Sequence, residues 1–122
     1  MASLVTNAGL ANVIAAWNAY ASRPIWLQFG TGSGQGGGAT DLASPVGSRA
    51  IGSTSQQTTT LAGDTLKIEG TVTATAPNTI TEVGVFDAGM AGNLDVYGDF
   101  TGIALALGDA IVFRVNVTAA AA

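Results

Sequence analysis

An alternation of apolar and polar residues runs from Asp64 to Val117 and limits the possible folds more than any other feature of the sequence. In its first segment the apolar positions are Leu66, Ile68, Val72 and Ala74, and the polar positions between them are Thr65, Lys67, Glu69, Thr71 and Thr73. Side chains that alternate with a period of two belong to strands with one buried face. Turn residues interrupt the run, so the sequence predicts antiparallel strands joined by hairpins.

The N-terminal part has helical periodicity instead. Residues 6–21 repeat apolar side chains at helical spacing, and the face they form consists of Leu10, Val13, Ile14, Trp17 and Tyr20. Thr6 is suited to cap the first turn, and Arg23-Pro24 should end the helix because the residue before proline avoids helical angles. We expect this face to cover the sheet.

Glycine and proline divide the segment between the helix and the long alternating run. The sequence of residues 24–29 is typical of a strand. Residues 30–38 are so rich in glycine that we expect them to form a flexible loop. Residues 39–47 predict one helical turn, and residues 48–61 predict one or two weak strands with a possible break at Gly52.

Together these elements predict a single domain over residues 1–122, with antiparallel strands in residues 48–117 and a tail at 118–122. The predicted fold class is mainly β: an antiparallel β-sandwich or a partly open barrel of roughly six to eight short strands, with one N-terminal α-helix.

Composition excludes several classes of function. The net charge is −4, and the basic residues are few and scattered (Arg23, Arg49, Lys67 and Arg114), which argues against binding to nucleic acid. The chain has no histidine and no cysteine, so Ser-His-Asp and Cys-His catalysis are impossible. Charged residues make up 10% of the chain against roughly 25% in an average soluble domain. This composition indicates either a surface covered in an assembly or a neutral Thr/Ser/Gly surface.

The remaining chemistry is sparse. Glu82 and Asp87 are the best carboxylates for an enzyme, whereas Asp95 and Asp99 lie about 13 Å apart on one strand face, too far for a glycosidase pair. Asp87, Asp95 and Asp99 lack the spacing of a calcium loop. The glycines at 32, 34 and 37 match a dinucleotide-binding motif only formally, because no helix is predicted to follow them. We therefore predict no enzyme activity, catalytic residue, metal or cofactor.

Several segments resemble a family of small structural proteins of tailed bacteriophages. The most specific is Ile80–Asp87, and the others are Val5–Leu10, Leu27–Gly32, Ala39–Leu42, Gly92–Leu94, Phe100 and Leu107–Asp109. Their order and spacing are similar to that family over nearly the whole chain. Segments related to Ile80–Asp87 also resemble parts of phage tail fibres.

The resemblance implies a virion protein of the capsid decoration (cement) type. Such a protein lies on the outer capsid surface, commonly as a homotrimer, and clamps neighbouring major capsid subunits. The partners expected are therefore the major capsid protein and further copies of this chain, with no nucleic acid and no membrane. The alternative is a tail-fibre or receptor-binding module. The candidate assembly contacts are Trp26, Gln28, Gly34, Gly36, Arg49 and Tyr97.

Overall fold

The computed structural model describes residues 3–120, which contain one helix and seven strands. In chain order the elements are α1 (Asn7–Ala19), β1 (Trp26–Gly30), β2 (Pro45–Ile51), β3 (Ser53–Gln57), β4 (Thr65–Thr73), β5 (Asn78–Phe86), β6 (Leu94–Leu105) and β7 (Ala110–Thr118). No helix in this part of the chain is long and apolar enough to cross a membrane.

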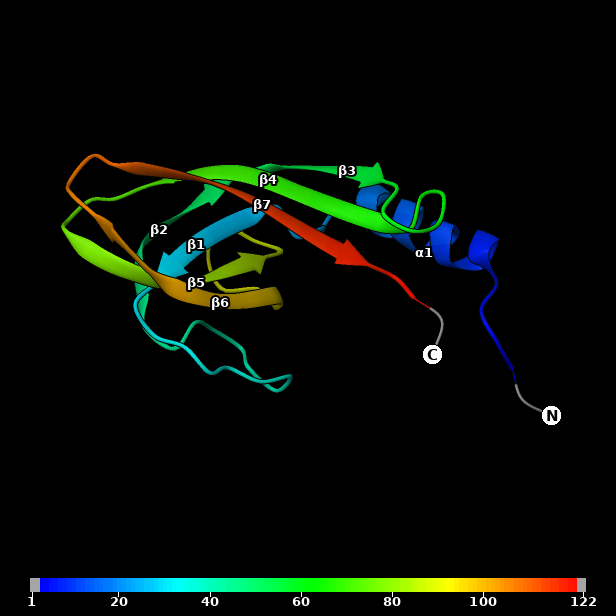
Figure 1. Cartoon of the computed structure of the whole chain (residues 1–122), viewed down its shortest axis with the longest axis horizontal. Helices are drawn as coiled ribbons and strands as arrows, with labels where there is room; N and C mark the ends of the chain where they lie inside the picture. Colours follow the sequence, from blue (N-terminus) through cyan, green and yellow to red (C-terminus); the bar gives the residue numbers. More distant parts are fainter. Residues whose placement is uncertain (1–2, 121–122) are drawn as a thin grey trace.

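The strands form two antiparallel sheets that pack as a sandwich, as predicted; they do not close into a barrel. Sheet A has the strand order β2-β1-β5-β6, and sheet B has the order β3-β4-β7. In Figure 1, sheet B runs along the molecule, sheet A lies beneath one end of it, and α1 lies at the other end, beside β3 and β4.

The chain crosses from sheet A to sheet B at Gly52, between β2 and β3. A Cβ at this position would overlap the backbone carbonyl of Glu69 and lie 2.8 Å from Cδ1 of Leu27. Only glycine leaves room for the chain to cross here, and the break that the sequence predicts at Gly52 lies at this crossing. The predicted weak strands in 48–61 are thus two strands, in different sheets.

The main core lies between the two sheets and follows the alternation of the sequence. Leu66, Ile68 and Val72 of β4 are at most 2% exposed, and they pack against Leu27 and Phe29 of β1. Each apolar position of β4 predicted from the alternation is buried. Thr65 is the exception on the polar side: it is only 1% exposed, because hydrogen bonds to Thr59 and Asp64 hold a loop over it.

The helix forms where predicted, but it buries a narrower face. The Thr6 hydroxyl accepts a hydrogen bond from the Gly9 amide, as a capping residue does. Leu10 and Ile14 are buried, whereas Val13 and Tyr20, which the sequence placed on the same face, are 58% and 57% exposed. The helix packs mainly on β3 and β4, so these strands cover only the central stripe of its apolar face.

Other boundaries also differ from the predictions. The first strand spans Trp26–Gly30 rather than 24–29, and Thr118, predicted to begin the tail, is the last residue of β7. Residues 121–122 of that tail lie outside the described residues. No helical turn forms in residues 39–47; β2 begins at Pro45 instead. Hydrogen bonds from the Ala43 and Ser44 amides to Glu82 fasten this segment to β5.

Candidate functional site

Glu82, near the middle of β5, lies at the centre of a cluster of hydrogen bonds on the face of sheet A that points away from sheet B. Its side chain is 0% exposed. One oxygen, Oε1, accepts from the Ala43 amide and the Tyr97 hydroxyl, at 3.0 and 2.8 Å. The other, Oε2, accepts from the amides of Gly32 and Ser44, at 3.0 and 2.8 Å. A single carboxylate therefore fastens both ends of the 31–44 loop to the sheet.

Two glycines make this arrangement possible. A Cβ at Gly30 would overlap the Glu82 carboxylate and the Ser44 carbonyl, and one at Gly32 would lie 2.6 Å from Cβ of Ala43. Their absence of side chains lets the loop backbone approach the buried acid. Close packing thus accounts for the glycines at the start of the segment, whereas Gly36, Gly37 and Gly38 have open space where a side chain would go.

The same hydrogen bonds control ionisation. Burial favours the neutral acid, but the hydrogen bonds from Ser44, Ala43, Tyr97 and Gly32 outweigh it and lower the pKa of Glu82 below its ordinary 4.5. Conversely, burial and the hydrogen bond to Glu82 raise the pKa of the Tyr97 phenol. At neutral pH the pair is therefore a carboxylate that accepts and a phenol that donates.

Further contacts hold both ends of the 31–44 loop. The Gly34 amide donates to Oδ2 of Asp99 at 3.0 Å, and the Thr81 hydroxyl donates to the Gly32 carbonyl at 2.6 Å. Leu42 is 4% exposed and packs on Gly84 of β5, separately from the main core. The loop therefore forms a third layer over sheet A.

Arg49 of β2 fixes the second loop on this face, residues 87–93. Its guanidinium carbon lies 3.5 Å from the centroid of the Phe86 ring. Nη1 donates to the carbonyls of Ala88 and Ala91, at 2.9 and 2.6 Å. Stacking and hydrogen bonding together hold the guanidinium in one orientation.

The six predicted assembly contacts gather on this same face, which we define as the loop face: sheet A's outer side with the 31–44 and 87–93 loops. Gly34 and Gly36 are exposed on the first loop. The other four residues are partly or largely covered by their own chain. Gln28 is 8% exposed and donates to the Gly47 carbonyl, and the Trp26 ring packs against Gly89. These side chains position the loops rather than project from them.

Two hollows open on the loop face. One, of about 310 Å³, lies between the 31–44 loop and β6, and its walls include Gln35, Asp95 and Tyr97. The other, of about 430 Å³, surrounds Arg49 and is lined by Asp41 and by Met90, which is 87% exposed.

The acids proposed for catalysis already have partners in the chain. Both Glu82 oxygens accept hydrogen bonds, and the Asp87 carboxylate accepts from the amide and the side-chain nitrogen of Asn93. Burial, followed by the charge of Asp87, raises the pKa of Asp95. Within residues 3–120, no three His, Cys, Asp or Glu side chains gather as metal ligands would.

Asp64 is a second anchoring carboxylate. It is 1% exposed, and it accepts hydrogen bonds from the amides of Thr59, Thr60 and Leu61 and from the Thr65 hydroxyl. These bonds, the Leu61 amide first, strongly lower the pKa of Asp64. The sequence did not indicate that Glu82 and Asp64 anchor loops. The one feature that could have suggested this role is that each is a single acid close to apolar strand residues.

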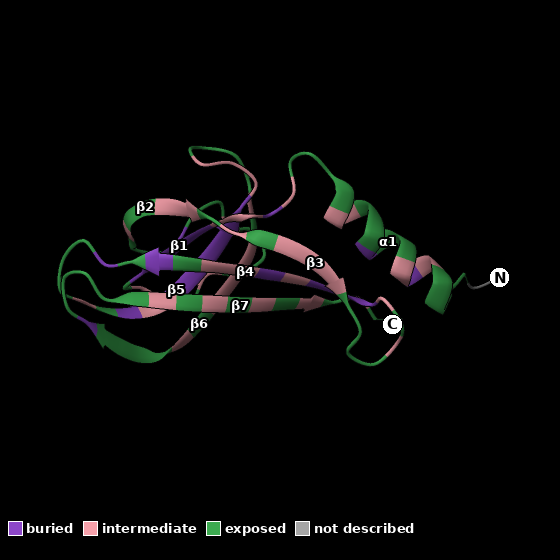
Figure 2. Cartoon of the chain, turned by 90° about the horizontal axis from the view of Figure 1, so that it is seen from above, coloured by how far each residue is buried: buried purple, intermediate pink, exposed green. Residues whose placement is uncertain are grey.

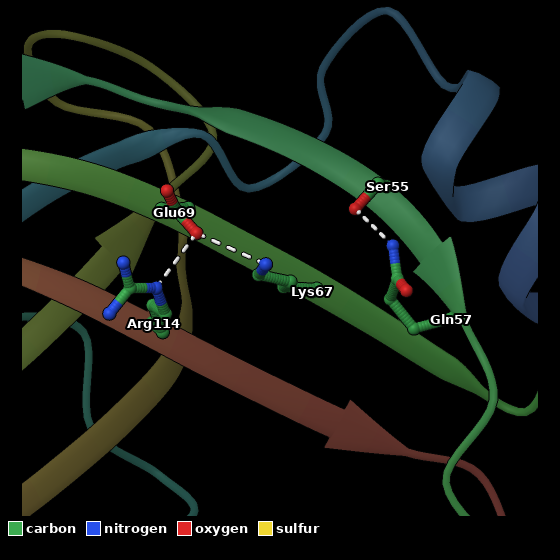
Figure 3. Close-up of polar contacts among 5 residues, drawn as sticks. All are labelled: Ser55, Gln57, Lys67, Glu69 and Arg114. Carbon is green, nitrogen blue, oxygen red and sulfur yellow. Dashed lines mark hydrogen bonds and ion pairs between the residues drawn. The ribbon is translucent and has the colours of Figure 1, made fainter.

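The outer face of sheet B is polar and open. Figure 3 shows Glu69 of β4 between Lys67 and Arg114, and Ser55 bonded to Gln57 on β3. Each of the two ion pairs of Glu69 has an N–O distance of 3.1 Å. The hydrogen bond and the charge of Lys67 lower the pKa of Glu69. Such exposed pairs contribute little to stability.

Comparison with models of known protein families and with curated proteins finds no match to this chain.

Proposed function

We propose that this chain is a structural protein of a tailed-bacteriophage virion, namely a capsid decoration (cement) protein. In this proposal it binds the outer capsid surface as a homotrimer and stabilises contacts between major capsid subunits. The proposal begins from the sequence resemblance carried by Ile80–Asp87 and the segments around it.

One observation supports it most. Four of the resembling segments lie far apart in the sequence but meet along β5: they are Leu27–Gly32, Ala39–Leu42, Ile80–Asp87 and Gly92–Leu94. They form β1, the end of the 31–44 loop, β5 and the start of β6. These four segments therefore form one spatial unit, the sheet A framework under the loop face.

The chemistry of the loop face suits binding better than turnover. The charged groups of Glu82, Asp87 and Arg49 form hydrogen bonds that hold the loops in place. A rigid loop loses little conformational entropy when it binds a partner. Many copies on one shell would multiply a weak contact through avidity. We therefore assign capsid binding to the loop face.

The direct test mixes the purified protein with undecorated capsids of the phage that encodes it. We expect it to sediment with the shells and to raise the temperature at which they break. Absence of binding would disprove the decoration function. The copy number in the virion distinguishes this function from the alternative. A tail-fibre or receptor-binding module is present in few copies, whereas a decoration protein is present in as many copies as it has positions on the shell.

A pair of variants tests the assigned surface. Gly36 has open space where a side chain would go, so G36E should fold and place a charge on the loop face. Thr71 is exposed on the outer face of sheet B, so T71E is the matched control. Capsid binding should weaken at least about tenfold for G36E alone. Equal binding by both variants would remove the loop face as the contact.

A further inference from the structure

The two sides of the sandwich are built differently. On one side, β2 continues into β3 through Gly52, so the chain itself joins the two sheets. On the other side, β6 and β7 are the last strands of their sheets within residues 3–120. The outward backbone groups of an edge strand are available to pair with another strand.

Three of the edge strands carry features that discourage such pairing. β2 starts with Pro45, has Gly47 at a positive φ of 69°, and its pairing with β1 shifts register. β3 is only five residues long. β6 shifts register twice against β5, and the 31–44 loop lies against its first half. Prolines, bulges, short length and covering loops are the usual protections of a sheet edge.

β7 has none of these protections. Its nine residues pair with β4 without a register shift, and they include no proline, glycine or lysine. Its inward side chains are also incompletely covered. Val115 and Val117 are half-buried, although Ile68 and Leu66, their partners on β4, are 0% exposed. Figure 2 shows β7 alternating between exposed and intermediate residues along its length.

Two hydrogen bonds just beyond the ends of β7 reveal which of its backbone groups are free. The Ala119 amide donates to the Asp64 carbonyl, and the Ala74 amide donates to the Asp109 carbonyl, at 2.8 and 2.7 Å. Hydrogen-bonded pairs alternate along an antiparallel ladder. Odd-numbered residues of β7 therefore bond to β4, and the even-numbered ones point their N–H and C=O outward. Those residues are Ala110, Val112, Arg114, Asn116 and Thr118.

We propose that the free edge of β7 pairs with β7 of a second copy of this chain, antiparallel about a two-fold axis at Val115. Pairing centred on Arg114 would place two arginines directly opposite each other, which is unfavourable. Centring on Val115 sets Arg114 opposite Asn116 and Val112 opposite Thr118. On the inner side it sets Val115 against its symmetry mate.

The pattern of β7 is what selects a second copy as the partner. In this register polar residues meet polar ones at the centre of the outer face, and the inner sides join into one apolar surface. The resulting sheet would have the order β3-β4-β7-β7-β4-β3. A two-fold contact closes after a pair, so it is distinct from any trimer contact and does not rest on the proposed capsid function.

Charge variants at Asn116 test this register. N116K places a lysine opposite Arg114 of the second copy, and N116E places a glutamate there. With two such pairs in the contact, N116K should weaken association about tenfold, and N116E should strengthen it. The measurement is molar mass by light scattering or sedimentation over a concentration series. We expect wild type to reach twice the mass of N116K. Equal masses for wild type, N116K and N116E would overturn the proposal.

Two further variants test the backbone and the symmetry. N116P removes an outward N–H and should halve the mass, whereas N116T keeps that N–H and should not; circular dichroism and thermal melting verify that each folds. Because the chain has no cysteine, V115C provides a single thiol at the axis. It should form disulfide-linked pairs under mild oxidation, faster than the more exposed V112C. Faster linkage of V112C, or a mass unaffected by N116P, would contradict the proposal.

Discussion

Replacing Glu82 with glutamine tests whether one carboxylate holds the loop face together. The substitution keeps the size of the side chain but removes the charge, and it turns one acceptor oxygen into an NH₂ donor. The Tyr97 hydroxyl can turn to accept from that NH₂. The amide of Ala43, which shares the same oxygen with Tyr97, cannot turn and would lose its acceptor.

The cost follows from these contacts. A buried amide without an acceptor costs about 1–3 kcal/mol, and hydrogen bonds to a neutral group are roughly half as strong as those to a charged one. Easier burial of the neutral amide offsets part of this loss. We expect E82Q to lower the free energy of unfolding by about 3 kcal/mol. At roughly 3–5 °C per kcal/mol for a chain of this size, the melting temperature should fall by about 10 °C.

Urea unfolding and thermal melting measure the effect, and hydrogen exchange locates it. In E82Q the amides of Gly32, Ala43 and Ser44 should exchange faster, because their acceptor is weakened or lost. The control is E69Q, the same change in an exposed carboxylate of sheet B, which should shift the melting temperature by less than about 2 °C.

The pH dependence has a defined sign. Because the folded state lowers the pKa of Glu82 below 4.5, ionised Glu82 stabilises the fold above that pH. This contribution is lost as pH falls from 4.5 through the folded-state pKa. The stability difference between wild type and E82Q should therefore be complete at neutral pH and shrink in acid. A loss below about 0.5 kcal/mol at neutral pH, with unchanged amide exchange, would refute the anchoring role.

Three further substitutions test the packing by denaturant unfolding and hydrogen exchange. W17A should lower the free energy of unfolding by about 2 kcal/mol, less than for a fully buried tryptophan, because this side chain is half-buried. V13A removes an exposed side chain and should lower it by less than about 0.5 kcal/mol; equal losses would mean that the helix packs on a wider face. G52A should lower the free energy of unfolding by about 2–3 kcal/mol, since a side chain would overlap the backbone of β4. G36A is the control, because its side chain would enter open space and should leave stability nearly unchanged. Similar losses for both variants would contradict the tight crossing between the sheets. D64A should speed amide exchange in residues 59–61 at least about tenfold, and unchanged exchange would exclude Asp64 as the anchor of that loop.

The sequence predicted the parts of the fold that depend on neighbours along the chain. Alternation in residues 66–74 identified a strand and its buried side correctly, because a strand places successive side chains on opposite faces whatever it packs against. Thr6 began the helix through local backbone geometry, whereas the helix ends at Ala19, before the Arg23-Pro24 stop that the sequence predicted. Gly52 also marked the break between two strands, although the crowding that requires glycine there arises from the tertiary structure.

The candidate site was less accessible, because its contacts join residues distant in the sequence. Trp26 and Gln28 lie on the strand face opposite Leu27, yet nothing local indicated that Gly89 would pack against the Trp26 ring or that Gln28 would donate to the Gly47 carbonyl. In the sequence, Glu82 was notable only as one of the two best carboxylates for an enzyme. Its role emerged only when the amides of residues 32, 43 and 44 met its oxygens.

By itself, then, the sequence determined a mainly β protein with one short helix and a surface poor in charge, because composition and periodicity act residue by residue. Only the tertiary structure decided which faces are covered and which edges remain free. Those outcomes depend on long-range contacts: loop amides converging on one carboxylate, a helix covered along one stripe, and a sandwich closed at Gly52 but open at β7. No periodic pattern encodes the distances between such groups.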